Sequence, residues 1–160
     1  MPSMTKQQRT EPDLSYLLDR SGHVLRTMMS TALAEIDLTA RMHCVLVHAV
    51  DEERTQAQLA EIGDIDKTTM VVTVDALEKQ GLAERRQSTR DRRARIIAVT
   101  EKGREVLRQS ERIVDEVHRS VLTSLSDADA RTLVRALGQL VDGALSTPDE
   151  GAATRRPRQR

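Results

Sequence analysis

Residues 55–103 read TQAQLAEIGDIDKTTMVVTVDALEKQGLAERRQSTRDRRARIIAVTEKG, and their changes of pattern decide the fold. Residues 55–58 form a capping box, which predicts the start of a short helix. Beyond a glycine-containing turn, Asp66 is a good N-cap for a longer helix over residues 67–80, and Gly81 ends that helix. The stretch therefore begins with two helices joined by a tight turn.

The spacing of the apolar residues changes after this second helix. Leu82–Arg86 predicts a short strand, and the β-branched run Arg95–Val99 predicts its partner. The loop between them, Gln87–Ala94, is basic, because residues 85–95 contain six Arg and one acid. Two helices followed by a basic hairpin describe a winged helix-turn-helix. The expected fold class is therefore mainly α with a small β-hairpin wing (α+β).

Amphipathic helices are predicted on both sides of this stretch. Apolar residues at spacings of three, four and seven predict a helix over residues 14–36, although Gly22 weakens it by about 1 kcal/mol relative to Ala. N-cap residues start three further helices, at Thr39, Thr100 and Ser126. The predicted parts are a disordered N-terminus (1–12), helical regions (13–37 and 101–146), a winged-helix lobe (38–100) and a disordered basic tail (147–160).

The charges of the 160-residue chain are unevenly distributed. The chain has 25 basic and 25 acidic residues, so the formal net charge is zero. Without the hairpin segment 85–95 and the four Arg of the tail, 15 basic residues remain against 24 acidic ones. Such a local concentration of Arg indicates a polyanionic partner. Tyr16 is the only aromatic residue, which argues against stacking on single-stranded nucleic acid.

Several other classes of protein do not fit the composition. No apolar run is long enough for a transmembrane helix, and the polar N-terminus predicts no secretory signal. A single cysteine forms no intramolecular disulfide, so we expect a cytoplasmic protein. The sequence has no glycine-rich phosphate loop and no Gly-x-Ser-x-Gly motif. We therefore expect no enzymatic activity, no catalytic residue and no cofactor.

Histidine and cysteine residues are candidates for metal binding or redox sensing. The four histidines are widely spaced, and His43 and His48 lie about 140° apart around a helix, so we expect no metal site and partly exposed histidines. Cys44 lies beside His43, which could lower its pKa and make it an oxidation sensor. We favour the alternative that Cys44 is a small half-buried apolar residue.

Seven short motifs together resemble one known family. In their order and spacing they are similar to the multiple antibiotic resistance regulator (MarR) family of bacterial and archaeal repressors, and the matching block covers about residues 38–107. The motifs are Leu38-Thr39, Leu59-Ala60-Glu61, Asp66-Lys67-Thr68-Thr69, Leu77-Glu78-Lys79-Gln80-Gly81-Leu82, Glu84-Arg85-Arg86, Asp91-Arg92-Arg93-Ala94 and Thr100-Glu101-Lys102-Gly103.

This resemblance implies a transcriptional repressor that binds a pseudo-palindromic DNA duplex as a homodimer. The first helix would form the dimer interface with the fifth and sixth helices. The family's wing motif implies that Arg93 enters the minor groove and that the carboxylate of Asp91 holds it. A guanidinium suits a narrow, electronegative minor groove, and a carboxylate can fix its fork. The family also commonly binds a small phenolic or amphipathic effector.

The residues of the second helix can be assigned to two faces. Met70, Val74 and Leu77 should face the core, which turns the first-turn polar residues outward. Val71 and Val72 also point outward, where they either touch thymine methyl groups or are tolerated exposed valines. The expected DNA-binding residues are Lys67, Thr68, Thr69, Val71 and Val72 of the helix, with Arg86, Arg90, Asp91, Arg92 and Arg93 of the hairpin.

Two alternatives to a specific DNA-binding regulator remain. The winged helix could be a protein-interaction module, although the dense Arg loop argues against a purely protein partner. It could also bind DNA non-specifically, although the acidic body argues against DNA packaging. The site of an effector is not assigned from the sequence, and the residues that could lie near such a cavity are Tyr16, Met28, Met42 and His43.

Overall fold

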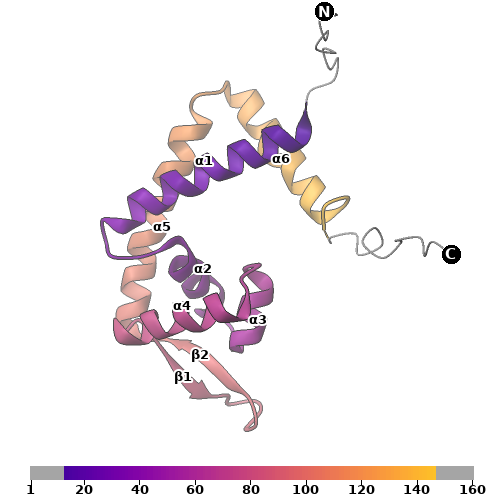
Figure 1. The fold of residues 1–160 in the computed structure, drawn as a ribbon. Coiled ribbons are helices and arrows are strands. Elements are labelled where there is room, and N and C mark those ends of the chain that lie inside the picture. The colour runs from indigo at the N-terminus through magenta and orange to yellow at the C-terminus, as the bar shows by residue number, and fades with distance from the viewer. Residues whose placement is uncertain (1–12, 147–160) are drawn as a thin grey trace, which may run out of the picture. The chain divides into compact units, whose positions relative to one another are not determined.

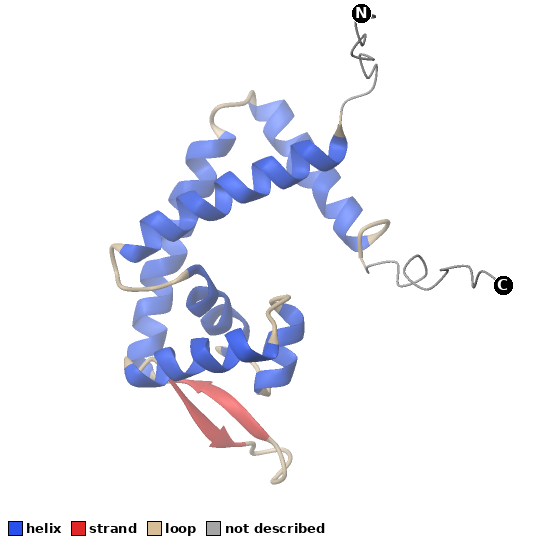
Figure 2. Ribbon diagram, viewed as in Figure 1, coloured by secondary structure: helices blue, strands red, loops and turns tan. Residues whose placement is uncertain are grey.

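A computed structural model of the chain describes residues 13–146 (Figure 1). The described residues form six helices and one antiparallel hairpin, which confirms the mainly α winged-helix class. Figure 2 shows the helices in blue and the hairpin in red. The expected disordered ends, residues 1–12 and 147–160, lie outside the described residues. The elements are α1 (Leu14–Ala34), α2 (Ala40–Ala49), α3 (Gln56–Ile62), α4 (Lys67–Lys79), β1 (Ala83–Gln87), β2 (Arg95–Val99), α5 (Glu101–Leu122) and α6 (Asp127–Asp142).

The helices begin at the capping residues that the sequence indicates. Thr39 accepts the N–H of Met42 at the start of α2. Thr55 and Gln58 form both bonds of a capping box at the start of α3. Ser126 caps α6 in the same way as Thr39 caps α2. Each bond satisfies a backbone N–H that a helix start otherwise leaves without an intrahelical partner.

The chain forms two compact units, one up to Val117 and the other from His118 onward. The first unit contains α1 to α4, the hairpin and most of α5, and its core is aliphatic. Met70, Val74 and Leu77 of α4 are each 0% exposed, as their spacing predicts. Core packing therefore fixes which face of α4 is left for a partner.

The second unit is dominated by α6. This helix lies wholly within the described residues, and none of its side chains is buried in the single chain. Its apolar residues are exposed instead, at Leu133, Val134, Leu137 and Val141. Across residues 13–146, no helix has the length and apolarity needed to cross a membrane.

The hairpin begins one residue later than predicted. β1 pairs with β2 from Ala83 opposite Val99 to Gln87 opposite Arg95. Leu82 stays outside the strand because it completes the end of α4, where Gly81 has a positive φ of 71°. The N–H of Leu82 donates to the carbonyl of Leu77, which is the Schellman arrangement at a helix C-terminus.

The loop between α2 and α3 lies along the outer edge of β2. The N–H of Ile97 donates to the carbonyl of Arg54 at 3.0 Å, and Thr55 forms an isolated bridge with Ile96. Arg54 also donates to the carbonyl of His48 near the C-terminus of α2. The hairpin is therefore supported along one edge by a segment that is itself bonded to α2.

The first turn of α5 passes very close to the end of α4. Thr100 caps this turn by accepting the N–H of Gly103, and its own N–H donates to the carbonyl of Leu82. A Cβ atom on Gly103 would lie 1.9 Å from the carbonyl oxygen of Leu82 and 2.8 Å from Val99 Cγ1. Only glycine fits here without a backbone shift, so Gly103 joins the hairpin tightly to α5.

The variant Gly103→Ala should lower the free energy of unfolding by roughly 1–3 kcal/mol or more, because the added methyl group meets backbone. Denaturant unfolding followed by circular dichroism measures this change. Gly22→Ala is the control, since its Cβ would meet only the mobile guanidinium of Arg26. We expect it to stabilise helix α1 by about 0.5–1 kcal/mol. Equal effects of the two variants would contradict the close approach.

Candidate nucleic-acid interface

The first two turns of α4 present a mixed polar and apolar surface. Lys67 and Thr68 are exposed, and Val71 and Val72 are 42% and 64% exposed. The sequence predicted this outward face. A partner that offers both polar and apolar contacts would cover this surface, and covering the two valines would remove apolar area from water.

Thr69 has a different position from its two polar neighbours. It is half-buried, and both its N–H and its hydroxyl donate to the carboxylate of Asp66, at 2.9 and 2.6 Å. The hydroxyl of Thr69, followed by its N–H, holds the pKa of Asp66 below its usual value. Thr69 therefore helps to start α4, in addition to the DNA contact expected of it.

The hairpin carries its cations on the outside. Arg90, Arg92 and Arg93 are exposed in the loop, and Arg86 of β1 is exposed with only a distant 3.9 Å pair to Glu84. In Figure 1 the hairpin projects from the first unit beyond α3 and α4. A projecting loop of cations is suited to reach into a groove or along a phosphate backbone.

Asp91 contacts Arg93 in a way that the sequence did not predict. Its carboxylate accepts the backbone N–H of Arg93 at 2.9 Å, and its carbonyl accepts the N–H of Ala94. We expected the carboxylate to fix the guanidinium fork of Arg93. In the structure it shapes the loop backbone, and the Arg93 side chain remains exposed.

Arg85 was not among the predicted site residues, and it points inward. Its guanidinium pairs with Asp75 at 2.8 Å and with Glu78, both on α4, and it donates to Gln56 of α3. Glu78 also accepts the backbone N–H of Arg85. The signal in the sequence is strand alternation, since Arg85 lies on the same face as buried Ala83. Arg85 therefore attaches the wing to both helices of the helix-turn-helix.

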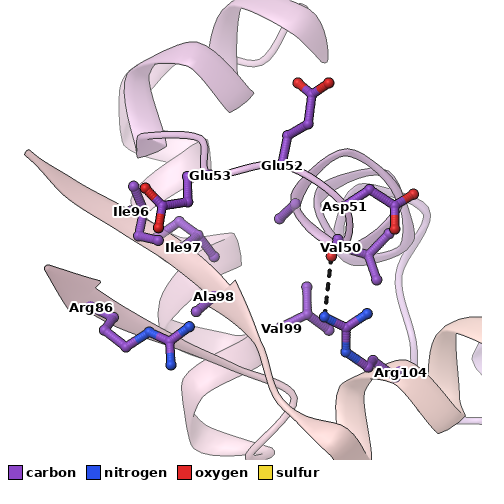
Figure 3. Close-up of a pocket in the computed structure, with 11 residues that line it drawn as sticks. Val50, Asp51, Glu52, Glu53, Arg86, Ile96, Ile97, Ala98, Val99 and Arg104 are labelled. Carbon is purple, nitrogen blue, oxygen red and sulfur yellow. Dashed lines mark hydrogen bonds between the residues drawn. The ribbon is translucent and has the colours of Figure 1, made fainter. Parts of the chain in front are cut away.

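A small pocket of about 140 Å³ lies between the α2–α3 loop and the hairpin (Figure 3). The guanidinium of Arg104 donates to the carbonyl of Val50 at one side of it. Figure 3 shows the carboxylate of Glu53 turned toward the strand at Ile96, while Glu52 points away from the strand. Among residues 13–146, no group of three or more His, Cys, Asp or Glu is placed to hold a metal ion.

Cys44 and His43 occupy different environments on α2. Cys44 is half-buried, and burial raises the pKa of its thiol, which disfavours the reactive thiolate. His43 is buried, whereas we expected partly exposed histidines. Its Nδ1 lies 2.8 Å from the hydroxyl of Ser110, which itself donates to the carbonyl of Leu107. This contact between His43 and Ser110 joins α2 to α5.

A shallow groove of about 500 Å³ runs along α1. Met28 lies on it, as expected for a residue near a cavity, but Tyr16, Met42 and His43 are not among its lining residues. Most of its lining surface is apolar. The lining residues are Arg20, His23, Val24, Thr27, Met28, Thr31, Ala32 and Glu35 of α1, with Val117 of α5.

Comparisons with known proteins agree with this geometry. A sequence model described as the MarR family matches residues 36–94. The chain is similar to CouR from Rhodococcus jostii RHA1 bound to p-coumaroyl-CoA, with 30% identity and a TM-score of 0.73, covering 83% of this chain and 94% of that one. CouR, a transcriptional repressor, has also been solved on a 23-mer DNA duplex, with 30% identity, a TM-score of 0.68 and coverage of 81% and 92%.

A third relative is a MarR family protein of Mycobacterium tuberculosis in complex with salicylic acid. It is 28% identical, with a TM-score of 0.70, and the match covers 82% of this chain and 98% of that one. These similarities extend well beyond the winged-helix lobe and include the flanking helices. They are similarities to regulators of transcription, not to enzymes.

The adjacent residues Arg85 and Arg86 should differ sharply in their effect on stability. Arg85→Ala removes a half-buried guanidinium group and should lower the free energy of unfolding by roughly 1–3 kcal/mol, because Glu78 and Asp75 lose their ion-pair partner. Arg86→Ala is the control, and its effect should stay within about 0.5 kcal/mol. Thermal or denaturant unfolding measures both, and similar losses would contradict the structural role of Arg85.

Proposed function

Because this chain belongs to the MarR family of transcriptional regulators, we propose that it is a repressor that reads duplex DNA in the cytoplasm with α4 and the wing. The observation that supports this best is the separation of faces in the first unit. One face of α4 is fully buried, and the opposite face combines exposed polar groups and valines beside a projecting cationic loop. Duplex DNA offers both phosphate charge and methyl groups to such a surface.

The proposed role of α4 is to enter the major groove. Lys67 and Thr68 lie in its first turn, where the N-terminal backbone N–H groups also favour phosphate. Thr69 contributes from the same turn, while Val71 and Val72 face base edges and contact thymine methyl groups. Apolar contacts of this kind discriminate thymine from cytosine without a hydrogen bond.

The proposed role of the wing is to reach the neighbouring minor groove. Arg93 enters that groove, and Asp91 orders the loop that presents it. The surrounding cations, Arg86, Arg90 and Arg92, contact phosphates. In this assignment Arg93 supplies shape readout, and the other three Arg mainly supply affinity that depends on salt.

The proposed assembly is a homodimer on a two-fold symmetric operator. Two helices support it by leaving large apolar side chains uncovered in the single chain. On α1, Leu14 and Leu17 are 57% and 50% exposed, and on α6, Val134 and Val141 are 56% and 62% exposed. Exposed apolar residues repeated along one helix face mark a site for a partner, and a second copy presents the same faces.

The proposed effector is a small amphipathic molecule that binds in the α1 groove. Its apolar lining residues Val24 and Met28 suit an aromatic ring, and the cation Arg20, which also lines the groove, suits a carboxylate. The ligands of the relatives, salicylic acid and p-coumaroyl-CoA, combine an aromatic ring with an anionic group. Such a ligand would release DNA if it binds the DNA-free arrangement more tightly.

The experiment that tests the function incubates the purified protein with sheared genomic DNA at near-physiological salt and sequences what is retained. Enrichment of a short inverted repeat near promoters supports a specific regulator, and added salicylate should lower that enrichment. Uniform retention that disappears with salt would indicate non-specific DNA binding. No retention, with or without ligand, would favour a protein-interaction module instead.

Arg93→Ala should weaken binding to the enriched operator by about 1–3 kcal/mol while leaving the fold unchanged, because the exposed side chain has no structural partner to lose. Fluorescence anisotropy with a labelled duplex measures the affinity. The control is Arg135→Ala, which removes the same charge from the exposed surface of α6. Unchanged affinity for the Arg93 variant would remove the wing from the mechanism.

Val134→Glu should convert the homodimer to a monomer, because it places a charge among the exposed apolar residues of α6. Light scattering after size exclusion measures the mass. Gln139→Glu is the matched control, since it introduces the same charge on the opposite, polar side of the helix and should leave the dimer intact. A monomeric wild type, or a dimeric Val134 variant, would contradict the proposed interface.

A further inference from the structure

Glu53 lies outside both DNA-reading elements, in the loop that follows α2. The next residue, Arg54, bonds this loop to two elements. Its guanidinium donates to the carbonyl of His48 in α2, and its own carbonyl accepts the N–H of Ile97 in β2. The position of Glu53 is therefore set by α2 and by the hairpin edge, and its carboxylate points toward the hairpin (Figure 3).

Both oxygens of the Glu53 carboxylate accept hydrogen bonds from the start of the wing loop. One accepts from the hydroxyl of Ser88 at 2.5 Å. The other accepts from the N–H of Thr89 at 3.1 Å and from its hydroxyl. A carboxylate that accepts three hydrogen bonds from two consecutive residues holds them in one conformation.

Ser88 transmits this constraint to the tip of the loop. Its side chain is 8% exposed, although the loop around it is open to solvent. Because the Ser88 hydroxyl donates to Glu53, its lone pairs are free to accept the N–H groups of Arg90 and Asp91, both at 3.1 Å. Asp91 then accepts the N–H of Arg93. A continuous chain of hydrogen bonds thus runs from Glu53 to the backbone N–H groups of Arg90, Asp91 and Arg93.

The carboxylate remains charged at any pH used for DNA binding. The hydroxyl of Ser88, followed by the hydroxyl and the N–H of Thr89, lowers the pKa of Glu53 to about 2. Its role therefore does not depend on a protonation change near neutral pH. It is a fixed negative charge beside a loop that carries Arg90, Arg92 and Arg93.

We propose that Glu53 is a positioning residue for DNA recognition. It orders the wing loop through Ser88 and Thr89 before DNA arrives, so that the loop loses less conformational entropy when the operator binds. Glu53 itself contacts no DNA in this scheme. The proposal rests on the DNA-binding function proposed above. Ordering a loop in advance strengthens binding because less conformational freedom is lost on association.

A simple electrostatic role for Glu53 predicts the opposite result. A carboxylate near the interface repels phosphate, so removing its charge should tighten DNA binding. Under the positioning role, Glu53→Gln should weaken binding, because the amide keeps one acceptor oxygen and can no longer accept from Ser88 and Thr89 through two oxygens at once. The sign of the change in operator affinity therefore distinguishes the two roles. A measurement of global stability alone would not distinguish them.

The test compares Glu53→Gln with Asp51→Asn by fluorescence anisotropy on the enriched operator. Both variants remove one negative charge from the same loop, but Asp51 is exposed and, in Figure 3, its carboxylate points away from the strand that contains Ile96. We expect Glu53→Gln to bind about tenfold more weakly and Asp51→Asn to bind as tightly as the wild type or slightly more tightly. Ser88→Ala breaks the next link and should weaken binding similarly. The double variant Glu53→Gln/Ser88→Ala should bind the operator no more weakly than the single variant with the lower affinity. The two residues belong to one chain of hydrogen bonds, so breaking it at a second point adds no further loss.

A second measurement on the DNA-free protein is independent of any operator. Amide hydrogen exchange at Arg90 and Asp91 should be severalfold faster in Glu53→Gln than in the wild type or in Asp51→Asn, while exchange in the core helices is unchanged. Unchanged exchange at these two amides would overturn the proposal. So would operator binding by Glu53→Gln that equals or exceeds that of the wild type.

The same experiments distinguish failure of the proposed DNA-binding function from failure of the proposed role of Glu53. If the wild type retains no duplex, the function is wrong and the role of Glu53 in operator binding is overturned with it. If the wild type binds an operator and only the Glu53 prediction fails, the function stands and Glu53 has no positioning role.

Discussion

The contacts of Arg85 with α4 determine where the wing stands relative to the recognition helix. The guanidinium lies between Asp75, Glu78 and Gln56, so one side chain of β1 is bonded to both helices of the helix-turn-helix. A half-buried pair of this kind gains little net stability relative to apolar side chains in the same place, although removing one partner alone is destabilising. Its main consequence is geometric, because a two-stranded hairpin alone is marginally stable and has no fixed orientation of its own. Two grooves can be read at once only if helix and wing keep a constant spacing.

The wing is supported at three places along its length. Arg85 holds its base, the bridge between Thr55 and Ile96 holds its edge, and Glu53 holds the start of its loop. This support offsets a specific difficulty. Three exposed Arg within four residues repel one another, and nothing apolar in the loop opposes that repulsion. Hydrogen bonds to Glu53, Ser88 and Asp91 oppose it through the backbone, so the guanidinium groups remain available for a partner.

Most of the fold could be predicted because its determinants are local in sequence. N-caps at Thr39, Asp66 and Ser126, together with helical periodicity, placed the helices to within a few residues. The start of β1 was placed one residue early because Leu82 belongs to the Schellman motif of α4, which the strand pattern alone does not reveal. The outward face of α4 followed from its core face, since the two are linked by helix geometry.

The internal contacts of the site could not be predicted in the same way. Arg85 lies within a run of Arg, and composition alone assigns all of them to the same partner. Glu53 and Ser88 are 35 residues apart in two loops, and loops have no periodicity from which a contact can be inferred. The Asp91 contact is local, but an aspartate can bond either a backbone N–H or a guanidinium, and the spacing of the two residues fits both.

The uneven distribution of charge gives these contacts a further consequence. With a net charge of zero, the chain has no overall attraction to DNA, and the excess of acidic residues outside the basic segments repels phosphate. An approach with the wing forward is favoured over one with the acidic surface forward, so electrostatics influences orientation before any base is read. An orientation chosen by a flexible wing would be poorly defined. Glu53 and Asp91, the acceptors that order the loop, are themselves acidic. They reduce the net positive charge near the loop, but they also fix the conformation in which its Arg residues are presented. In the proposed mode of binding, affinity then depends less on total charge and more on the fit of α4, where the exposed Val71 and Val72 would make contacts that salt does not screen.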